Sequence, residues 1–458
     1  MNSFNLYTKT SPLKLFFMVA VPGAISMIAS SLWGLFDGIF VGQLLGETAF
    51  AALNLAFPFV LINFSLADLI GVGSAVPISI ALGKKQEKEA NNYFTCACLM
   101  IFITGVAMGI IFYFAAPLLM ELMGANEALA DLAVRYIRVY AICSPFTTIT
   151  FAVDNFLRIC GRIKSSMVLN ILMSVIILGM EFLFLSVLKM GIGGSALAVS
   201  LGMFICSVIA LYPFWRKKLA LRFCRPHFSF RLVRQIVSSG SPNFLSSIAA
   251  RLTSILMNVV LLHVGGHTAV TVYGILMYAG DILQQLLYGT CDSLQPAIGY
   301  NWGAGSIQRV KSIAKCCLAA GAVISIGGTL IMLFCPEVIA TLFLKENEKD
   351  LMAMSAYALQ IYSLTYLTRW FGFAMQSFLI ALEKPLPATI LSVANAFVFP
   401  VALLAVLWPL KLDGIWLNTP ITSALVALLA FLLFICMKKR LSVSERAYSS
   451  SDDETTKA

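Results

Sequence analysis

The chain has 458 residues, of which 59% are hydrophobic and only 12% are charged. Because soluble globular proteins carry about 25% charged residues, this composition excludes a soluble domain and predicts an integral membrane protein. The formal net charge of +10 does not indicate a nucleic-acid partner, since the basic residues are segregated by loop in the pattern typical of membrane proteins.

A transmembrane helix needs about 20 mostly apolar residues, and twelve stretches of the chain meet this requirement. The first follows Lys9 and Lys14 and is too long for the hydrophobic region of a signal peptide, so we expect it to be retained. Several stretches exceed 20 residues, which predicts tilt or protrusion from the membrane. The sequence therefore predicts an all-α integral membrane protein whose twelve transmembrane helices cover residues 13–42, 51–82, 92–117, 128–158, 165–188, 193–214, 235–263, 270–298, 314–335, 351–380, 387–409 and 414–437.

Basic residues gather in alternate loops between these helices. Residues 84–88, 158–164, 216–234, 309–315 and 438–446 carry most of them, and the intervening loops carry few. Because loops rich in Lys and Arg stay in the cytoplasm, both termini are expected to be cytoplasmic. The predicted location is a bacterial-type inner (cell) membrane, with the chain crossing it many times.

The chain also repeats itself at a nearly constant offset. Residues 220 positions apart are identical at several distant points, which are Pro22 and Pro242, Gly46 and Gly266, Gly83 and Gly303, and Gly194 and Gly414. An even number of helices in each repeat gives both the same orientation, as in transporters that rock two bundles about a central site. We therefore expect two pseudo-symmetric six-helix bundles, residues 1–213 and 235–440.

A basic linker, residues 214–234, joins the predicted bundles. It contains seven Arg and Lys residues and no acid, a composition that suits the anionic headgroups of membrane lipids. After the last helix, residues 441–458 are rich in Ser, Asp and Glu, and we expect a disordered cytoplasmic tail there.

Acidic residues inside apolar helices are the first candidates for function. Asp37 interrupts an apolar, glycine-rich run, although an ionised Asp near the bilayer centre costs roughly 2.5–3.5 kcal/mol. Asp37 could be a proton or sodium site, which we favour, or a structural hydrogen-bonding group. Glu181 lies at a similar predicted depth, so the two carboxyl groups could share a proton or hold a cation.

Two other intramembrane acids, Asp154 and Asp68, are weaker candidates for function. Asp154 lies four residues before Arg158, a spacing that puts both on one helix face and predicts an internal ion pair. The role of Asp68 is undecided between substrate or ion binding and packing.

The predicted eighth helix contains Asp281 and Asp292. Asp281 could face a cationic substrate or pair with Arg251 or Arg369, and pairing is favoured because unpaired buried charge is rare. Both acids are possible substrate or ion sites.

Met257 and Tyr278 are candidates for lining a central cavity, together with other Met and aromatic residues. Such surfaces adapt to varied hydrophobic cations. For any one of these side chains, packing or lipid contact is the plainer alternative.

Several stretches together resemble the multidrug and toxic compound extrusion (MATE) family, most closely its DinF/MepA-like branch. These are Asp-Gly-Ile-Phe-Val-Gly at 37–42, Gln-Pro-Ala-Ile-Gly-Tyr-Asn-Trp-Gly-Ala-Gly at 295–305, Arg-Ile-Cys-Gly-Arg-Ile-Lys at 158–164, Gly-Ser-Ala-Leu-Ala at 194–198 and Gly-Ile-Trp-Leu-Asn-Thr-Pro-Ile at 414–421. The resemblance implies a MATE-like arrangement of two bundles and places Asp37 at the family's signature position. It places Glu181 where the family has an Asp, and Ile177 and Val199 where it often has polar residues.

No pattern typical of an enzyme or a metal site is present in the sequence. There is no Walker A sequence, no Gly-x-Ser-x-Gly and no His-Glu-x-x-His. The 11 cysteines form no Cys-x-x-Cys, and the three histidines have no metal-ligand spacing, so we expect no metal and no cofactor. Without a nucleotide site, transport would depend on an ion gradient.

We expect, from the resemblance, a secondary active multidrug efflux antiporter that is a monomer. It would export organic cations or amphipathic compounds in exchange for H⁺ or Na⁺. An alternative is a lipid-linked oligosaccharide flippase of the same superfold, but a polyanionic cargo calls for many arginines, and only Arg251 and Arg369 are intramembrane. A membrane enzyme acting on lipids would need clustered catalytic residues, which the sequence does not offer.

Overall fold

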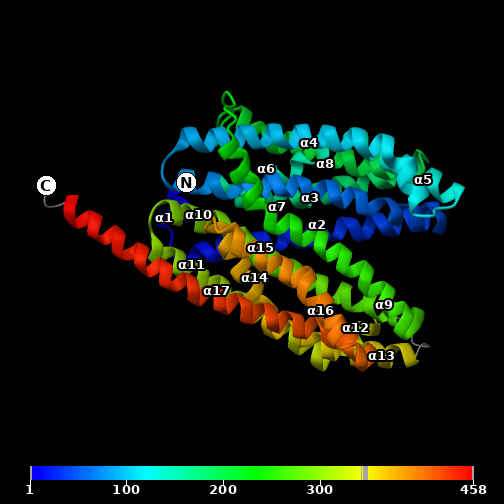
Figure 1. Cartoon of the computed structure of the whole chain (residues 1–458). Helices are drawn as coiled ribbons and strands as arrows, with labels where there is room; N and C mark the ends of the chain where they lie inside the picture. The colour runs from blue at the N-terminus through cyan, green and yellow to red at the C-terminus, as the bar shows by residue number, and fades with distance from the viewer. Residues whose placement is uncertain (1–2, 342, 344–348, 456–458) are drawn as a thin grey trace.

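The computed structural model describes residues 3–341, 343 and 349–455, with side chains described for all of these except 31–33, 35, 47, 349 and 437–455. All the regular elements in these ranges are helices (Figure 1). They are α1 (Ser3–Lys9), α2 (Pro12–Leu45), α3 (Glu47–Gly83), α4 (Glu87–Leu122), α5 (Glu127–Thr147), α6 (Ile149–Ile159), α7 (Ile163–Glu181), η1 (Phe182–Val187), α8 (Ile192–Trp215), α9 (Phe230–Cys291), η2 (Asp292–Leu294), α10 (Gln295–Gly303), α11 (Ile307–Phe334), α12 (Pro336–Thr341), α13 (Lys349–Ser363), α14 (Thr365–Ala381), α15 (Pro385–Val393), η3 (Ala394–Val398), α16 (Phe399–Val406), η4 (Trp408–Leu410) and α17 (Lys411–Thr455).

Ten helical segments of the described chain are long and apolar enough to cross a membrane. One of them, Phe230–Gly303, has 74 residues and is broken at Gly266, where φ is 66° and ψ is −162°, so it accounts for two predicted crossings. Another predicted crossing is divided into α13 and α14, which meet at Leu364. The prediction of an all-α membrane protein is confirmed, and these two features reconcile ten segments with twelve predicted helices.

Some predicted helices are interrupted within the membrane-spanning region. The crossing predicted at 128–158 divides into α5 and α6, where the hydroxyls of Thr147 and Thr148 both donate to the Ser144 carbonyl, at 3.1 and 2.9 Å. Such side-chain bonds compete with the backbone ladder and bend helices. The π-helical segments η1 and η3 interrupt two more crossings, and apolar periodicity alone does not reveal such irregularities.

The helices form two bundles joined by a linker (Figure 1). We call α2–α8 with η1 the N-lobe, and α9–α17 with η2–η4 the C-lobe. Between α8 and α9 the linker lies against α4, where the backbone N–H groups of Arg222 and His227 donate to Asn91 Oδ1 and Asn92 Oδ1, each at 2.8 Å.

Glycines allow the two lobes to touch along α2, α3 and α9. A Cβ atom added at Gly240 of α9 would come 1.9 Å from the Leu69 carbonyl oxygen on α3, and one added at Gly289 would come 2.3 Å from Ala24 Cα on α2. Similar contacts join Gly73 to Ile236, Gly83 to Tyr300 and Gly303 to Ile80. The absence of side chains at these glycines is therefore what lets the backbones meet.

The short helix α1 links both lobes at the end of the molecule where the chain begins (Figure 1). The Tyr7 hydroxyl donates to the Arg158 carbonyl in the N-lobe. From the C-lobe, Asn301 Nδ2 donates to the Tyr7 carbonyl at 2.9 Å, and Arg309 Nη2 donates to the Thr10 carbonyl at 2.6 Å. We call this the closed end, because α1 and the glycine contacts hold the lobes together there.

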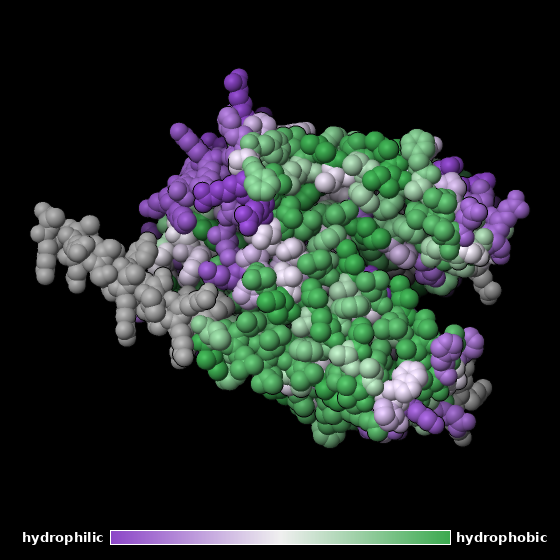
Figure 2. All heavy atoms as spheres, in the orientation of Figure 1, coloured by the Kyte–Doolittle hydropathy of each residue, from purple (hydrophilic) through white to green (hydrophobic). Residues whose placement is uncertain are grey.

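At the opposite end, which we call the open end, the lobes separate. Figure 2 shows the molecule hollowed between them there, with hydrophilic residues at both ends and a broad apolar band between. This apolar band is consistent with residence in a membrane, because lipid tails would cover it.

The last helix extends beyond its predicted end. We expected disorder from residue 441, whereas the described backbone of α17 is helical to Thr455 and projects from the closed end (Figure 1). Extending an existing helix avoids the costly nucleation step, so a polar segment can continue a transmembrane helix without packing of its own.

The lobe contact predicts unequal effects of two identical substitutions on α9. Gly240→Ala places a methyl group against the Leu69 carbonyl and should destabilise the closed end by about 1–3 kcal/mol. Gly274→Ala is the matched control, because no atom lies within 4 Å of its Cβ position, and it should be neutral or stabilising by up to about 1 kcal/mol. Thermal unfolding of the purified variants measures both effects, and equal changes would contradict the proposed role of Gly240.

Candidate functional site

Asp37 is buried inside the N-lobe, near the open end of α2. Its side chain is 1% exposed, and Ser195 Oγ donates to its Oδ1 at 2.7 Å. Ser195 lies in the first turn of α8, so the positive end of that helix lies near the carboxyl group. The serine and the helix end both favour a negative charge at this position.

Glu181 is the second acid of this site and is fully buried. Neither of its carboxyl oxygens receives a hydrogen bond from a described N–H or hydroxyl donor. Its neighbour is Asp37, whose carboxyl group lies close enough to share a proton with it. Because two carboxylates offer only acceptors, a hydrogen bond between them needs a proton on one of the two.

The local chain path brings these groups together from distant parts of the sequence. The α-helical hydrogen-bonding pattern of α7 ends at Glu181, and the π-helical segment η1 follows it directly. The chain then turns at Gly191, where φ is 66°, and α8 starts at Ile192. π-Helical segments frequently mark functional sites, since they re-aim the side chains beside them.

Apolar side chains occupy the positions where the family resemblance leads one to expect polar partners. Ile177 is fully buried and Val199 is 2% exposed. A further polar group, the buried phenol of Tyr136, is an electrostatic neighbour of both acids. In the described part of the chain, no group of three or more His, Cys, Asp or Glu side chains is placed to hold a metal ion.

A second polar cluster lies in the N-lobe nearer the closed end. Arg158 Nη2 and Asp154 Oδ2 are 2.8 Å apart, with side chains 5% and 16% exposed, so the predicted pair is present in the structure. Ser166 Oγ and Asn170 Nδ2 also donate to Asp154 Oδ1, and Asn170 Nδ2 donates to Ser26 Oγ at 2.7 Å. These bonds connect α2, α6 and α7, so the cluster has a structural role.

Asp68 and Asp292 lie where the two lobes meet. Asp68 of α3 has Asp154 and Asp292 as electrostatic neighbours, which places three acids near one another across the interface. Asp292 receives hydrogen bonds from Ser377 Oγ and from Gln295 Nε2, so its carboxyl group is held within the C-lobe.

Asp281 is exposed, and Gln285, one helical turn further along α9, is its polar neighbour. Arg251 and Arg369 are its electrostatic neighbours, but neither guanidinium forms an ion pair with a described carboxylate. The favoured pairing of Asp281 with an arginine is therefore absent as a direct contact.

The two predicted cavity residues lie in different settings. Met257 is 2% exposed and belongs to the C-lobe core, so packing explains it. Tyr278 is 61% exposed and stacks on Phe343, with ring centroids 6.0 Å apart.

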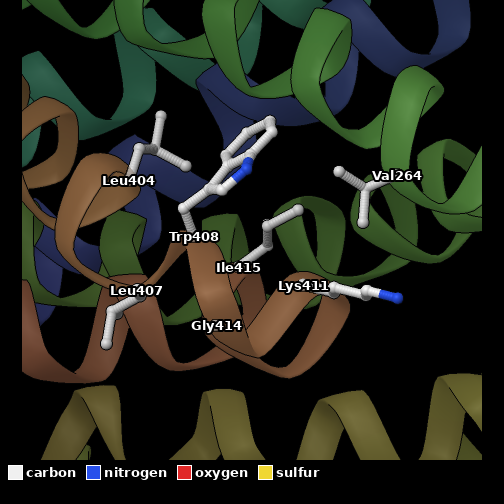
Figure 3. A pocket seen from close by; sticks show the side chains of 7 residues that line it. All are labelled: Val264, Leu404, Leu407, Trp408, Lys411, Gly414 and Ile415. Carbon is white, nitrogen blue, oxygen red and sulfur yellow. The ribbon is translucent and has the colours of Figure 1, made fainter.

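A small apolar pocket lies between α9 and the connection from α16 to α17 (Figure 3). Val264, Leu404, Trp408 and Ile415 line it, and the Lys411 side chain extends away from the Trp408 indole. Because no polar groups converge there, we assign it no function.

Sequence reasoning found the acids but missed their small polar partners. Ser195 and Ser26 were missed because a serine in an apolar helix has no distinguishing periodicity. Ser166 and Asn170 are spaced four residues apart, as are Asp154 and Arg158, so a shared helix face was the available signal.

Comparisons with known proteins agree with this architecture. The MatE family model matches residues 22–185 and 242–406, once in each lobe. The chain is 24% identical over 451 residues to "Multidrug export protein MepA" of Staphylococcus saprophyticus, covering 96% of this chain and 97% of the relative. It is also 24% identical over 450 residues to the protein of that name in Staphylococcus aureus, covering 95% and 97%.

Solved structures share the fold. One described as the "Outward-facing conformation of a multidrug resistance MATE family transporter of the MOP superfamily" has a TM-score of 0.89 at 22% identity, covering 97% of this chain and 98% of that one. Another, "MATE in the bent conformation", has a TM-score of 0.90 at 21% identity, covering 98% and 99%.

The chain offers a matched test of the buried ion pair. Asp154→Asn leaves Arg158 buried without its counter-charge and should cost about 3–5 kcal/mol. Asp131→Asn breaks a pair of the same spacing, with Arg135 at 2.9 Å, whose side chains are 57% and 68% exposed, and should cost about 1 kcal/mol or less. Unfolding of the two variants in detergent compares them, and a similar loss in both would refute the structural role of the buried pair.

Proposed function

Because the chain belongs to the MATE family, we propose that it is a secondary active multidrug efflux antiporter that exports organic cations or amphipathic compounds in exchange for protons. The observation that carries the coupling is the contact between Asp37 and Glu181 inside the N-lobe. The names of the relatives, which are multidrug export proteins, support the choice of cargo.

The surroundings of the acid pair favour a proton over a sodium ion. A hard cation is typically held by several oxygen ligands. Beyond the two carboxyl groups, the site offers Ser195 Oγ and the Tyr136 phenol, while Ile177 and Val199 fill neighbouring positions with hydrocarbon. A proton needs only the two carboxyl groups, and it supplies the donor that the Glu181 oxygens lack.

The shape of the molecule suggests how proton binding and export are linked. Because loops rich in Lys and Arg stay in the cytoplasm, the closed end would face the cytoplasm and the cleft would open to the outside. A proton arriving from outside would neutralise the acid pair, weakening its attraction for a cationic substrate and favouring release. The lobes would then rock apart at the closed end, where glycines bring the backbones of α2, α3 and α9 together.

The driving force is sufficient for useful export. One elementary charge crossing 100 mV supplies about 2.3 kcal/mol. For an uncharged or zwitterionic substrate exchanged for one proton, this corresponds to a concentration ratio of roughly fiftyfold. A pH gradient in the same direction adds to it. One-for-one exchange of a proton for a monovalent cation moves no net charge, so the pH gradient alone drives it.

Efflux from proteoliposomes tests this proposal. With a cationic dye, an imposed pH gradient should drive efflux by the unmodified protein, and a sodium gradient alone should not. Asp37→Asn and Glu181→Gln should each reduce proton-driven efflux at least tenfold, because neither altered pair can exchange a proton as the native pair does. Asp131→Asn is the control, since its side chain is 57% exposed at the end of the N-lobe and should leave efflux unchanged.

Two results would contradict the proposal. Efflux driven by sodium alone would replace the proton as coupling ion, and full proton-driven efflux by Asp37→Asn would remove Asp37 from coupling. Absence of dye movement under either gradient would count against drug export itself.

A further inference from the structure

Arg251 projects from α9 toward the cleft between the lobes. It lies 11 residues after Gly240, which is about three helical turns, so its side chain leaves α9 on the side that touches α3. Thr253, on the opposite side of the helix, instead donates to the Ala396 carbonyl inside the C-lobe at 2.5 Å. Arg251 is exposed, which fits a position beyond the glycine contact where the lobes separate.

Arg369 reaches the same region from α14. Its Nε donates to Gln284 Oε1 at 2.7 Å, and its guanidinium carbon lies 5.9 Å from the centre of the Tyr366 ring. These contacts fix the plane of the guanidinium while occupying one of its five N–H donors. Arg369 is therefore positioned, yet retains donors for another partner.

The charges on this wall do not balance. Asp281 is an electrostatic neighbour of both arginines, so one carboxylate faces two guanidinium groups. No described carboxylate lies within ion-pair distance, 4.0 Å, of either arginine. A net positive charge therefore remains on the C-lobe side of the cleft, opposite the N-lobe that contains the acid pair.

Aromatic side chains lie beside these two arginines. Tyr288, an electrostatic neighbour of both arginines, is 37% exposed and packs edge-on against Phe373, with ring centroids 4.7 Å apart. Asp292 is also its neighbour, which locates Tyr288 between the lobe contact and the arginines. The rings of Tyr288 and Phe373 thus form an apolar surface beside guanidinium groups that have no ion-pair partner among the described residues.

We propose that Arg251 and Arg369 form an anion-binding subsite on the C-lobe wall of the cleft, which takes the carboxylate of amphipathic aromatic substrates. Guanidinium groups bind carboxylates through paired hydrogen bonds, and the neighbouring rings would cover the aromatic body. The two arginines would then determine how strongly the protein prefers a substrate with a free carboxylate over its ester. This inference rests on the proposed export function and assigns residues to substrate choice.

Two dyes of nearly the same shape test the subsite. Rhodamine 110 carries a free carboxyl group, and rhodamine 123 is its methyl ester. Equilibrium binding to the purified protein, followed by fluorescence polarisation, should be tighter for the free acid. Arg251→Gln and Arg369→Gln should each weaken binding of the free acid about tenfold and leave the ester within about twofold.

Matched variants separate charge from general disruption. Arg251→Lys should retain part of the preference, because it keeps the charge but loses the paired hydrogen bonds. Arg138→Gln is the control, since Arg138 is held by Tyr113 on the N-lobe and does not contribute to the wall. Thermal unfolding of each variant checks that it is folded.

Several results would overturn the subsite. One is tighter binding of the ester than of the acid by the unmodified protein, a comparison that needs no variant. Another is an equal loss of both dyes in the glutamine variants. If free-acid binding disappears when phosphatidylglycerol replaces phosphatidylcholine in nanodiscs, the subsite belongs to a lipid headgroup. Because binding is measured without a gradient, failure of proton-driven efflux would not affect the result.

Discussion

Two carboxyl groups buried side by side constrain this protein more than any other contact. Asp37 is held by Ser195, whereas Glu181 has no described donor and lies against Asp37. Two full negative charges at such a place would lack compensation, so a shared proton is the simplest way to satisfy both groups. A π-helical segment follows Glu181 directly, and α8, which carries Ser195, starts at Ile192.

The two lobes are joined at the closed end and separate at the other, where the cleft lies. At the closed end the lobes meet through glycines and through α1, whose backbone accepts hydrogen bonds from Asn301 and Arg309. In the proposed mechanism the N-lobe contributes the acid pair and the C-lobe contributes Arg251 and Arg369, so the two lobes differ chemically.

Much of the architecture could be predicted from the sequence, because apolar runs and loop charge are direct consequences of the bilayer. The pair of Asp154 and Arg158 was also predictable, since a four-residue spacing fixes their relative positions. The placement of Asp37 beside Glu181 could only be suggested, because it depends on how α2 packs against α7. The division of α5 from α6, the π-helical segments and the missing ion pair of Asp281 depend on tertiary contacts, which periodicity does not record.

The most direct measurement is the number of protons released when a cationic substrate binds. Purified protein in weakly buffered detergent solution would be titrated with ethidium while the pH is recorded. The account predicts about one proton released per ethidium bound by the unmodified protein, and none by Asp37→Asn. If ethidium binds with no proton release, or if Asp37→Asn releases the same number, the pair of Asp37 and Glu181 does not couple transport to protons.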